Sequence, residues 1–242
     1  LVLRPDVTIP IARMVANNYK TSKENFKVYY NHQVFRMDNE NRREFTQTGV
    51  EFFGSKQPEA DAEVINIAIK SLLKSNVEFQ IEIGHANYYK GLLDEMNIND
   101  EETALQLKEL IENKNFVELG KLTDKLNLTD NVKEVIVQIP NLYGNFEEVL
   151  KQAKELCLNE KMCTSVEELQ EVYEIIKDFG YDKYITVDLG LVNHLDYYTG
   201  VIFKGYLADH GEIVLSGGRY DKLTENYGQY IPATGFGLNV DE

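Results

Sequence analysis

Hydrophobic and polar positions alternate with a period of two in several short segments of the chain. Residues 27–36 (KVYYNHQVFR) and 43–53 (REFTQTGVEFF) are rich in Val, Tyr and Phe, a composition typical of strands. The polar segment 37–42 separates them, so we expect an antiparallel hairpin. Residues 78–84 (EFQIEIG) alternate strictly and predict a third strand.

A helical period takes over between and after these strands. Residues 59–75 carry apolar side chains at positions 62, 65, 69, 72 and 73, a spacing that predicts a helix. Residues 86–180 are rich in Leu, Glu and Lys and show helical periods without a strand signal of comparable quality. The periods break at 97–100, 127–130, 140–145 and 159–164. We interpret 86–180 as a helical insertion.

Strand signals return in the last quarter of the chain. They cover 184–188, 197–206, 211–216 and 233–238, and a short helix is expected near 219–227. Six or seven strands, mostly joined by hairpins, with the helices grouped apart, favour an α+β fold with an antiparallel sheet. The predicted domains are a core formed by 1–85 and 181–242, and the insertion 86–180.

Charge narrows the classes of partner. The 242 residues include 25 Lys and Arg against 40 Asp and Glu, for a net charge of −15. Such a chain repels phosphate backbones unless it carries a concentrated basic face. The densest basic cluster is Arg42-Arg43, and Glu40 and Glu44 flank it. We therefore expect no nucleic-acid partner.

Hydropathy and the two cysteines exclude further classes. No stretch approaches 18 uninterrupted apolar residues, so no membrane span is expected. Cys157 and Cys163 lie six residues apart, without metal-ligand spacing, so we expect neither a disulfide scaffold nor a zinc site. This use of cysteine predicts a reducing, cytoplasmic location. The chain opens at Leu1 with an apolar segment, so we expect the natural protein to begin further upstream.

Polar residues occupy the middle of the predicted sheet. Gln47 and Glu51 share one face of their strand with Arg43, Phe45, Gly49 and Phe53, and Glu78, Gln80 and Glu82 share a face of theirs. Buried polar groups are costly when unpaired. The face is therefore either solvated or the floor of a small-molecule pocket, whose carboxylates would favour an ammonium or imidazolium ligand.

Three residues near the beginning of the chain and at the hairpin have two interpretations each. Asp6 and Thr8 precede Pro10, which suits the first turn of a helix. Thr8 is either the N-cap of that helix, or both side chains point into a pocket. Arg36 is either a solvent-facing hairpin arginine or an anion clamp.

The segment 191–200 (LVNHLDYYTG) is dense in hydrogen-bonding groups. His194 has no second His at ligand spacing, so no metal is expected. Tyr197 and Tyr198 alternate across a predicted strand, which places one in the core and the other in a pocket. Ser216-Gly217-Gly218 allows close backbone approach but lacks the spacing of a phosphate loop.

Taken in order, these segments resemble the catalytic domain of the class II aminoacyl-tRNA synthetases, specifically the histidyl branch. The matching motifs are LRPDVTIPIARM (3–14), YYNHQVFR (29–36), REFTQTGVEFFG (43–54), ADAEVI (60–65), LDYYTGVIF (195–203), GGRYDKL (217–223) and ATGFGL (233–238). The resemblance implies the fold of that class, an antiparallel sheet flanked by helices. It also implies a histidine pocket formed by Asp6, Thr8, Arg36, Gln47, Glu51, Tyr197 and Tyr198.

Departures from the synthetase pattern fall on cationic positions. The synthetase motif has Arg-Gly before LDYY, where this chain has Asn193-His194. Its last motif has a Glu-Arg pair, and the corresponding stretch here is Asn239-Val240-Asp241-Glu242, with an acid where the cation is expected. Adenylyl transfer depends on such positive charges. The Arg36-Met37-Asp38 start of the turn also departs from the synthetase Arg-x-Glu. The resemblance therefore implies a pocket without catalytic residues or cofactor.

A synthetase-like domain of this kind is similar to the regulatory subunits of ATP phosphoribosyltransferase, and the NHLDYYTG form of the motif resembles theirs. That resemblance implies a homodimeric core in a hetero-oligomer with a short catalytic subunit, which it activates, and L-histidine as the feedback effector. The alternative is a catalytic-domain fragment of a histidyl-tRNA synthetase.

Overall fold

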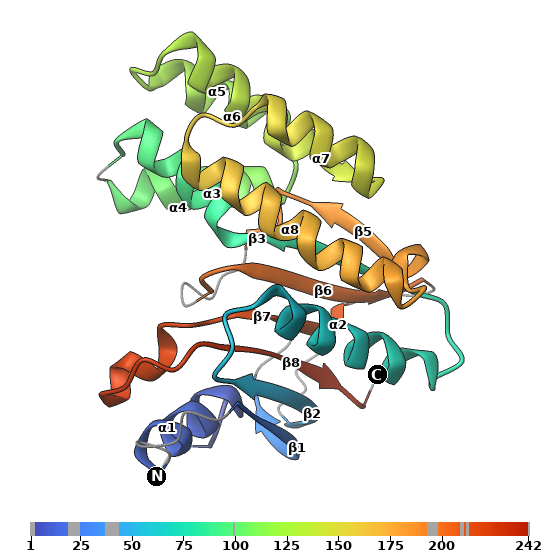
Figure 1. Ribbon diagram of the computed structural model, residues 1–242. Helices are drawn as coiled ribbons and strands as arrows, with labels where there is room; N and C mark the ends of the chain where they lie inside the picture. Colours follow the sequence, from blue (N-terminus) through green and yellow to red (C-terminus); the bar gives the residue numbers. More distant parts are fainter. Residues whose placement is uncertain are drawn as a thin grey trace.

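The computed structural model describes residues 3–18, 25–36, 44–98, 100–192, 198–208, 211 and 213–241. Within these residues an eight-stranded sheet has the order β1-β2-β8-β7-β6-β3-β5-β4 (Figure 1). Neighbouring strands are antiparallel except β3 and β5, which are parallel. The predicted α+β class is confirmed. The strands are β1 (Phe26–Phe35), β2 (Glu44–Phe53), β3 (Phe79–His85), β4 (Tyr143–Gly144), β5 (Ile185–Asp188), β6 (Val201–Leu207), β7 (Ile213–Arg219) and β8 (Ala233–Asn239).

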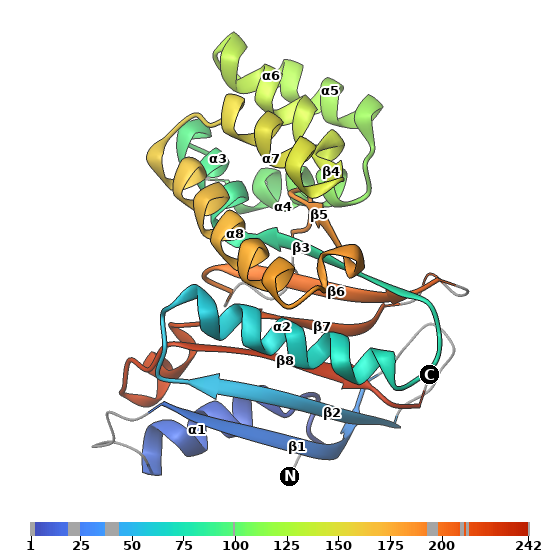
Figure 2. The ribbon, with the colours of Figure 1, turned by 45° about the vertical axis from the view of Figure 1, so that its right-hand side comes forward.

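Helices cover the two faces of the sheet unequally. α2 and α8 cross one face, α1 lies on the other at the β1–β2 end, and α3 to α7 gather beyond β5 (Figure 2). The helices are α1 (Thr8–Asn18), α2 (Pro58–Leu73), α3 (Ala86–Met96), α4 (Glu101–Glu112), α5 (Phe116–Lys125), α6 (Asp130–Gln138), α7 (Phe146–Glu155) and α8 (Glu160–Asp178), and the 3-10 turns are η1 (Ile139–Asn141), η2 (Asp182–Tyr184) and η3 (Leu223–Tyr227).

Short polar side chains begin most helices of the segment 86–180. Four of these helices start after a residue whose side chain accepts a hydrogen bond from a backbone N–H of the first turn, as N-cap residues do. These residues are Asp100, Asn115, Asn145 and Asn159. The predicted breaks at 97–100, 127–130 and 140–145 agree with the structure. The prediction missed the break at 113–115 and placed the last one too late, since α8 begins at Glu160.

The chain differs from prediction on either side of β6 and β7. The strand expected from 197 begins only at Val201, and the helix expected near 219–227 is the 3-10 turn η3. Gly217 and Gly218 are part of β7, and neighbouring atoms leave no room for a Cβ at either position. The close backbone approach expected at this glycine pair is thus confirmed.

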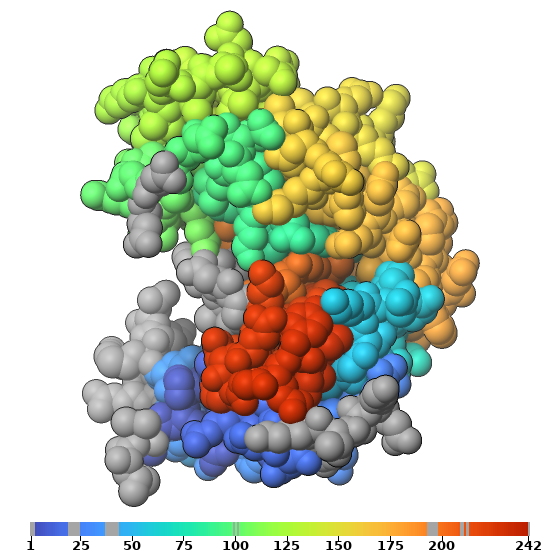
Figure 3. All heavy atoms as spheres, turned by 60° about the vertical axis from the view of Figure 1, so that its left-hand side comes forward, coloured from blue at the N-terminus to red at the C-terminus, as the bar shows by residue number. Residues whose placement is uncertain are grey.

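Alternation along β2 divides the core into two clusters. Phe52 packs with the large cluster that the sheet forms with α2 and α8, whereas Phe53 packs with the smaller cluster beneath α1. The large cluster continues into α3–α7, and its members on α8 pack against α2 and β3. Figure 3 shows α3–α8 gathered above the C-terminal segment in red and the start of α2 in cyan.

The division of the chain into a core domain and an insertion at 86–180 stays a prediction.

Candidate functional site

A cavity of about 330 Å³ opens on the α1 face of the sheet. The start of α1, the end of β1, the strands β2, β7 and β8, and the segment before β6 all contribute to its wall. Six of the seven residues expected from the sequence line it. The lining comprises Pro5, Asp6, Thr8, Arg36, Gln47, Glu51, Tyr198, Ser216, Tyr220, Gly235, Phe236 and Gly237. Residues far apart in sequence are thus brought to one place.

Glu51 forms the polar centre of the cavity. Its side chain is buried, at 1% exposure. Its Oε1 accepts a hydrogen bond from Thr8 Oγ1 at 2.7 Å, and its Oε2 accepts one from the Tyr220 hydroxyl. The pKa of Glu51 is raised to about 7: burial and, as a smaller effect, the carboxylate of Asp6 raise it, and the hydroxyl donors of Tyr220 and Thr8 partly offset them. The carboxyl group is held in one orientation and favours a cationic neighbour.

The start of α1 places two further polar groups at the cavity. Asp6 Oδ1 accepts a hydrogen bond from the backbone N–H of Ile9 at 2.9 Å and so satisfies a donor of the first helical turn. Thr8 is already the first residue of α1, and its hydroxyl bonds Glu51. The interpretation of Thr8 as N-cap is therefore wrong, and Asp6 takes that role in part.

Arg36 lies at the rim of the cavity, directly after β1. Its side chain is exposed, and its Nε donates to the carbonyl oxygen of Pro5 at 2.6 Å. The backbone N–H of Phe35 donates to the carbonyl oxygen of Arg4 at 2.9 Å. Arg36 therefore faces solvent and lines the cavity at once, and it fastens the segment before α1 to the sheet.

Two glycines of β8 make room for the polar side chains of β2. A Cβ at Gly235 would lie 1.7 Å from Glu51 Oε2, and one at Gly237 would lie 2.2 Å from Gln47 Nε2. Gln47 Oε1 is buried and has no hydrogen-bond partner among the described residues. Such an orphaned acceptor is costly unless a donor completes it. Gln47 thus offers a ligand an acceptor inside the cavity.

Tyr220 is a site residue that the sequence analysis did not single out. It is 1% exposed and donates to Glu51. The neighbouring Arg219 fixes the end of β7, because its guanidinium contacts Asp61 Oδ2 at 2.8 Å and Asp221 Oδ1 at 3.1 Å. The available signal was its place directly after the Gly-Gly-Arg of a matched motif.

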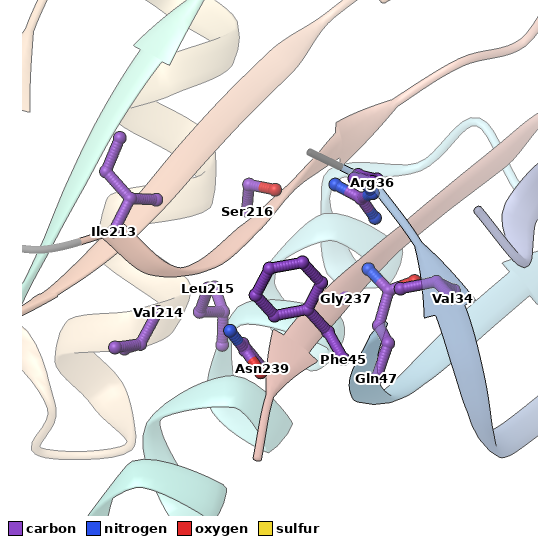
Figure 4. A pocket seen from close by; sticks show the side chains of 10 residues that line it. All are labelled: Val34, Arg36, Phe45, Gln47, Ile213, Val214, Leu215, Ser216, Gly237 and Asn239. Carbon is purple, nitrogen blue, oxygen red and sulfur yellow. The ribbon is translucent and has the colours of Figure 1, made fainter. Parts of the chain in front are cut away.

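A second cavity of about 220 Å³ adjoins the first. The two share Arg36, Gln47, Ser216 and Gly237. Figure 4 shows the side chains of Phe45, Gln47 and Arg36 facing those of the strands β7 and β8. The lining also includes Val34, Ile213, Val214, Leu215 and Asn239. The polar cavity therefore extends into a more apolar recess.

The remaining candidates from the sequence have different outcomes. Tyr197, Asn193, His194 and Glu242 fall outside the described residues. Tyr198 lies in the segment before β6, so the expected alternation across a strand does not apply to it. Glu82 of β3 does not line either cavity, and burial and the carboxylate of Asp188 raise its pKa.

The geometry suits recognition of a small cation that carries hydrogen-bond donors. Asp6 and Glu51 supply negative charge, and Gln47 supplies a neutral acceptor within the same wall. Across the described residues, no group of three or more His, Cys, Asp and Glu side chains is arranged to hold a metal ion. In the same part of the chain, no helix is long and apolar enough to cross a membrane.

Comparison with known proteins places this site in context. The family model described as histidyl-tRNA synthetase matches residues 1–242. The ATP phosphoribosyltransferase regulatory subunit of Clostridium botulinum (strain 657 / Type Ba4) is 42% identical, over 100% of this chain and 58% of the relative. That of Alkaliphilus metalliredigens (strain QYMF) is 43% identical, over 100% of this chain and 62% of the relative. The chain thus spans about three fifths of these curated relatives.

A solved structure agrees with the fold. It is described as an ATP phosphoribosyltransferase regulatory subunit/histidyl-tRNA synthetase from Bacillus halodurans C. The two chains are 35% identical and superpose with a TM-score of 0.89, covering 98% of this chain and 62% of the other. The described strands and helices therefore follow an architecture already seen experimentally.

Proposed function

This chain belongs to the histidyl-tRNA synthetase family, and from that premise we propose that it is the histidine-binding, non-catalytic part of an ATP phosphoribosyltransferase regulatory subunit. The observation that carries the proposal is the similarity of the whole chain to regulatory subunits of that name. Its role is to sense histidine and to activate or restrain a short catalytic partner.

The cavity supports histidine as the ligand. Histidine carries an ammonium group and an imidazole ring, and both donate hydrogen bonds. The carboxylates of Asp6 and Glu51 and the orphaned acceptor of Gln47 complement these donors. Tyr198 and Tyr220 add aromatic surface beside Glu51, and Tyr197 is proposed to close the site with them. Arg36 supplies the positive charge that a ligand carboxylate requires.

Two positions of the sequence indicate that this protein does not form histidyl-adenylate. Asn193 and Glu242 replace two arginines of the synthetase pattern, and both positions lie outside the described residues. One missing cation of this kind costs orders of magnitude in phosphoryl or adenylyl transfer. We therefore favour the regulatory function over a fragment of an active synthetase.

Regulation requires a partner and a coupling. A short-form phosphoribosyltransferase subunit is the proposed catalytic partner, in a cytoplasmic hetero-oligomer built around a homodimer of this protein. The two free cysteines fit a reducing compartment. Histidine bound here changes turnover in the partner through a coupling free energy between the two sites. The coupling is reciprocal for binding: if histidine changes the affinity of the partner for its ligand, that ligand changes the affinity for histidine by the same factor.

Co-expression of the full-length protein with a short catalytic subunit tests the function. We expect the two to co-purify, and histidine to inhibit ATP phosphoribosyltransferase turnover in the complex but not in the catalytic subunit alone. Histidine-dependent pyrophosphate exchange is the matched control, and it should stay at background. Exchange at the rate of a true synthetase, together with a failure to co-purify, would establish the alternative.

A further inference from the structure

The start of α3, residues 86–90, holds the backbone that precedes β6. Three consecutive carbonyl oxygens, those of residues 198, 199 and 200, accept hydrogen bonds from it. Lys90 Nζ donates to Tyr198 O at 2.7 Å, and Asn87 Nδ2 donates to Thr199 O at 3.1 Å. The backbone N–H of Ala86 donates to the carbonyl oxygen of residue 200 at 2.9 Å. These bonds fix a segment that lies outside any strand.

This end of α3 is itself held firmly. His85 is 2% exposed, and its Nδ1 accepts from the backbone N–H of Asn87 at 3.2 Å. Its Nε2 contacts Glu168 Oε2 on α8 at 2.7 Å. Because Nδ1 accepts, Nε2 carries the proton and donates to the carboxylate. The buried His85 at the end of β3, bonded to the carboxylate of Glu168 on α8, therefore anchors the donors that hold the backbone of Tyr198.

Tyr198 connects these hydrogen bonds to the cavity wall. Its side chain is 6% exposed and lines the cavity beside Tyr220. A Cβ at Gly218 would lie 2.8 Å from Tyr198 Cδ1, so the ring lies directly against the backbone of β7. A ring packed this closely follows any displacement of its own backbone. The position of the Tyr198 hydroxyl thus depends on the α3 donors.

We propose that Lys90 is a positioning residue for the histidine pocket, acting through the backbone carbonyl of Tyr198, with Asn87 in the same role at Thr199. The inference rests on the proposed function, since histidine is the ligand whose affinity it sets. Lys90 is half-buried, and a charged donor gives a stronger hydrogen bond than a neutral one. The structure thereby assigns part of the pocket's affinity to a residue that does not line it.

Calorimetry with L-histidine on the full chain tests the assignment. Lys90→Met should weaken histidine binding about five- to tenfold, within the range of coupling between contacting residues. Lys90→Arg, which keeps a charged donor, should recover most of the affinity. Lys161→Met is the matched control, because Lys161 Nζ also bonds a residue of α3, Asp94 Oδ2 at 2.5 Å, on the exposed side. That control should bind histidine as the wild type does.

A double-mutant cycle with Tyr198→Phe separates positioning from a general structural effect. If Lys90 acts through Tyr198, its replacement should cost little further affinity once the hydroxyl is gone. Full additivity of the two changes, or unchanged affinity in Lys90→Met, would overturn the assignment. Asn87→Ala gives a second, independent variant if Lys90→Met does not fold. A wild-type protein that binds no histidine would remove the proposed function, whereas binding that ignores both variants would remove only this inference.

Discussion

At the scale of single residues, Glu51 carries most of the chemistry of the cavity. It is buried on β2, yet two hydroxyl groups orient its oxygen atoms. A buried carboxylate with only neutral donors lacks a balancing charge. A cationic ligand supplies that charge, so ligand affinity and the ionisation of Glu51 are linked.

Replacement of Glu51 by Ala should weaken histidine binding by about 1.5–3 kcal/mol, the scale of a hydrogen bond to a charged group. The physical reason is the loss of a carboxylate that complements a ligand donor. Calorimetry measures the affinity, and the complex should then need more histidine for inhibition while uninhibited turnover changes far less. Glu63→Ala is the control, because Glu63 is an exposed carboxylate that bonds Lys27. Equal histidine affinities in the two variants would show that histidine binds outside this cavity.

The pKa of Glu51 predicts how stability depends on pH in the unliganded protein. A carboxyl group whose pKa rises on folding stabilises the fold below its unfolded pKa, and this stabilisation is lost as pH rises through the folded pKa. For Glu51 the window runs from the ordinary value of 4.5 to about 7. Glu51→Gln cannot ionise, so relative to it the wild type should lose stability between these values. Urea unfolding of both proteins at pH 5 and pH 8 measures the difference. If the free energy of unfolding changes equally with pH in both proteins, the raised pKa of Glu51 is contradicted.

At the scale of secondary-structure elements, β8 shapes the cavity through residues that lack side chains. Gly235 lies directly opposite Glu51 in the β2–β8 pair. Gly237 lies opposite Gly49, and a Cβ there would meet the side chain of Gln47. The two glycines differ in what surrounds them. Near Gly235 a Cβ would also meet the carbonyl oxygen of Val50 at 2.6 Å, whereas the closest atom to a Cβ at Gly237 belongs to the flexible end of Gln47.

These surroundings predict different outcomes for the two alanine variants. Gly235→Ala should destabilise the fold by about 1–3 kcal/mol and also abolish ligand binding, because backbone atoms of a central strand cannot move aside. Gly237→Ala should displace Gln47 and weaken histidine binding with a smaller cost in stability. Thermal unfolding and calorimetry on the pair measure both effects. The reverse order of stabilities would show that β2 and β8 are not packed as described.

At the scale of the whole molecule, the net charge bears on whether this protein binds tRNA. The net charge of −15 opposes a polyanion, and binding through phosphate contacts weakens steeply with salt. We expect no binding of histidine tRNA at micromolar concentrations of the full-length protein in about 0.15 M salt, the physiological value. A gel-shift titration measures this, with an active histidyl-tRNA synthetase as the positive control. Submicromolar binding specific to histidine tRNA would instead favour the synthetase alternative.

The sequence by itself determined the element types and most of the polar wall. Period-two alternation located β1, β2 and β3, because one face of a half-buried strand must be apolar. Ordered motifs identified Asp6, Thr8, Arg36, Gln47, Glu51 and Tyr198, which line one cavity. The family and the α+β class follow from such local patterns.

Only the tertiary structure decided how those residues work together. No spacing reveals that Tyr220 bonds Glu51, 169 residues away, or that Gly235 must lack a Cβ for the same carboxylate to fit. The hydrogen bond from Lys90 to the carbonyl oxygen of Tyr198 likewise joins two residues that are 108 positions apart in the sequence. Periodicity records which face of an element is buried, whereas contacts between distant elements depend on how the sheet and helices pack.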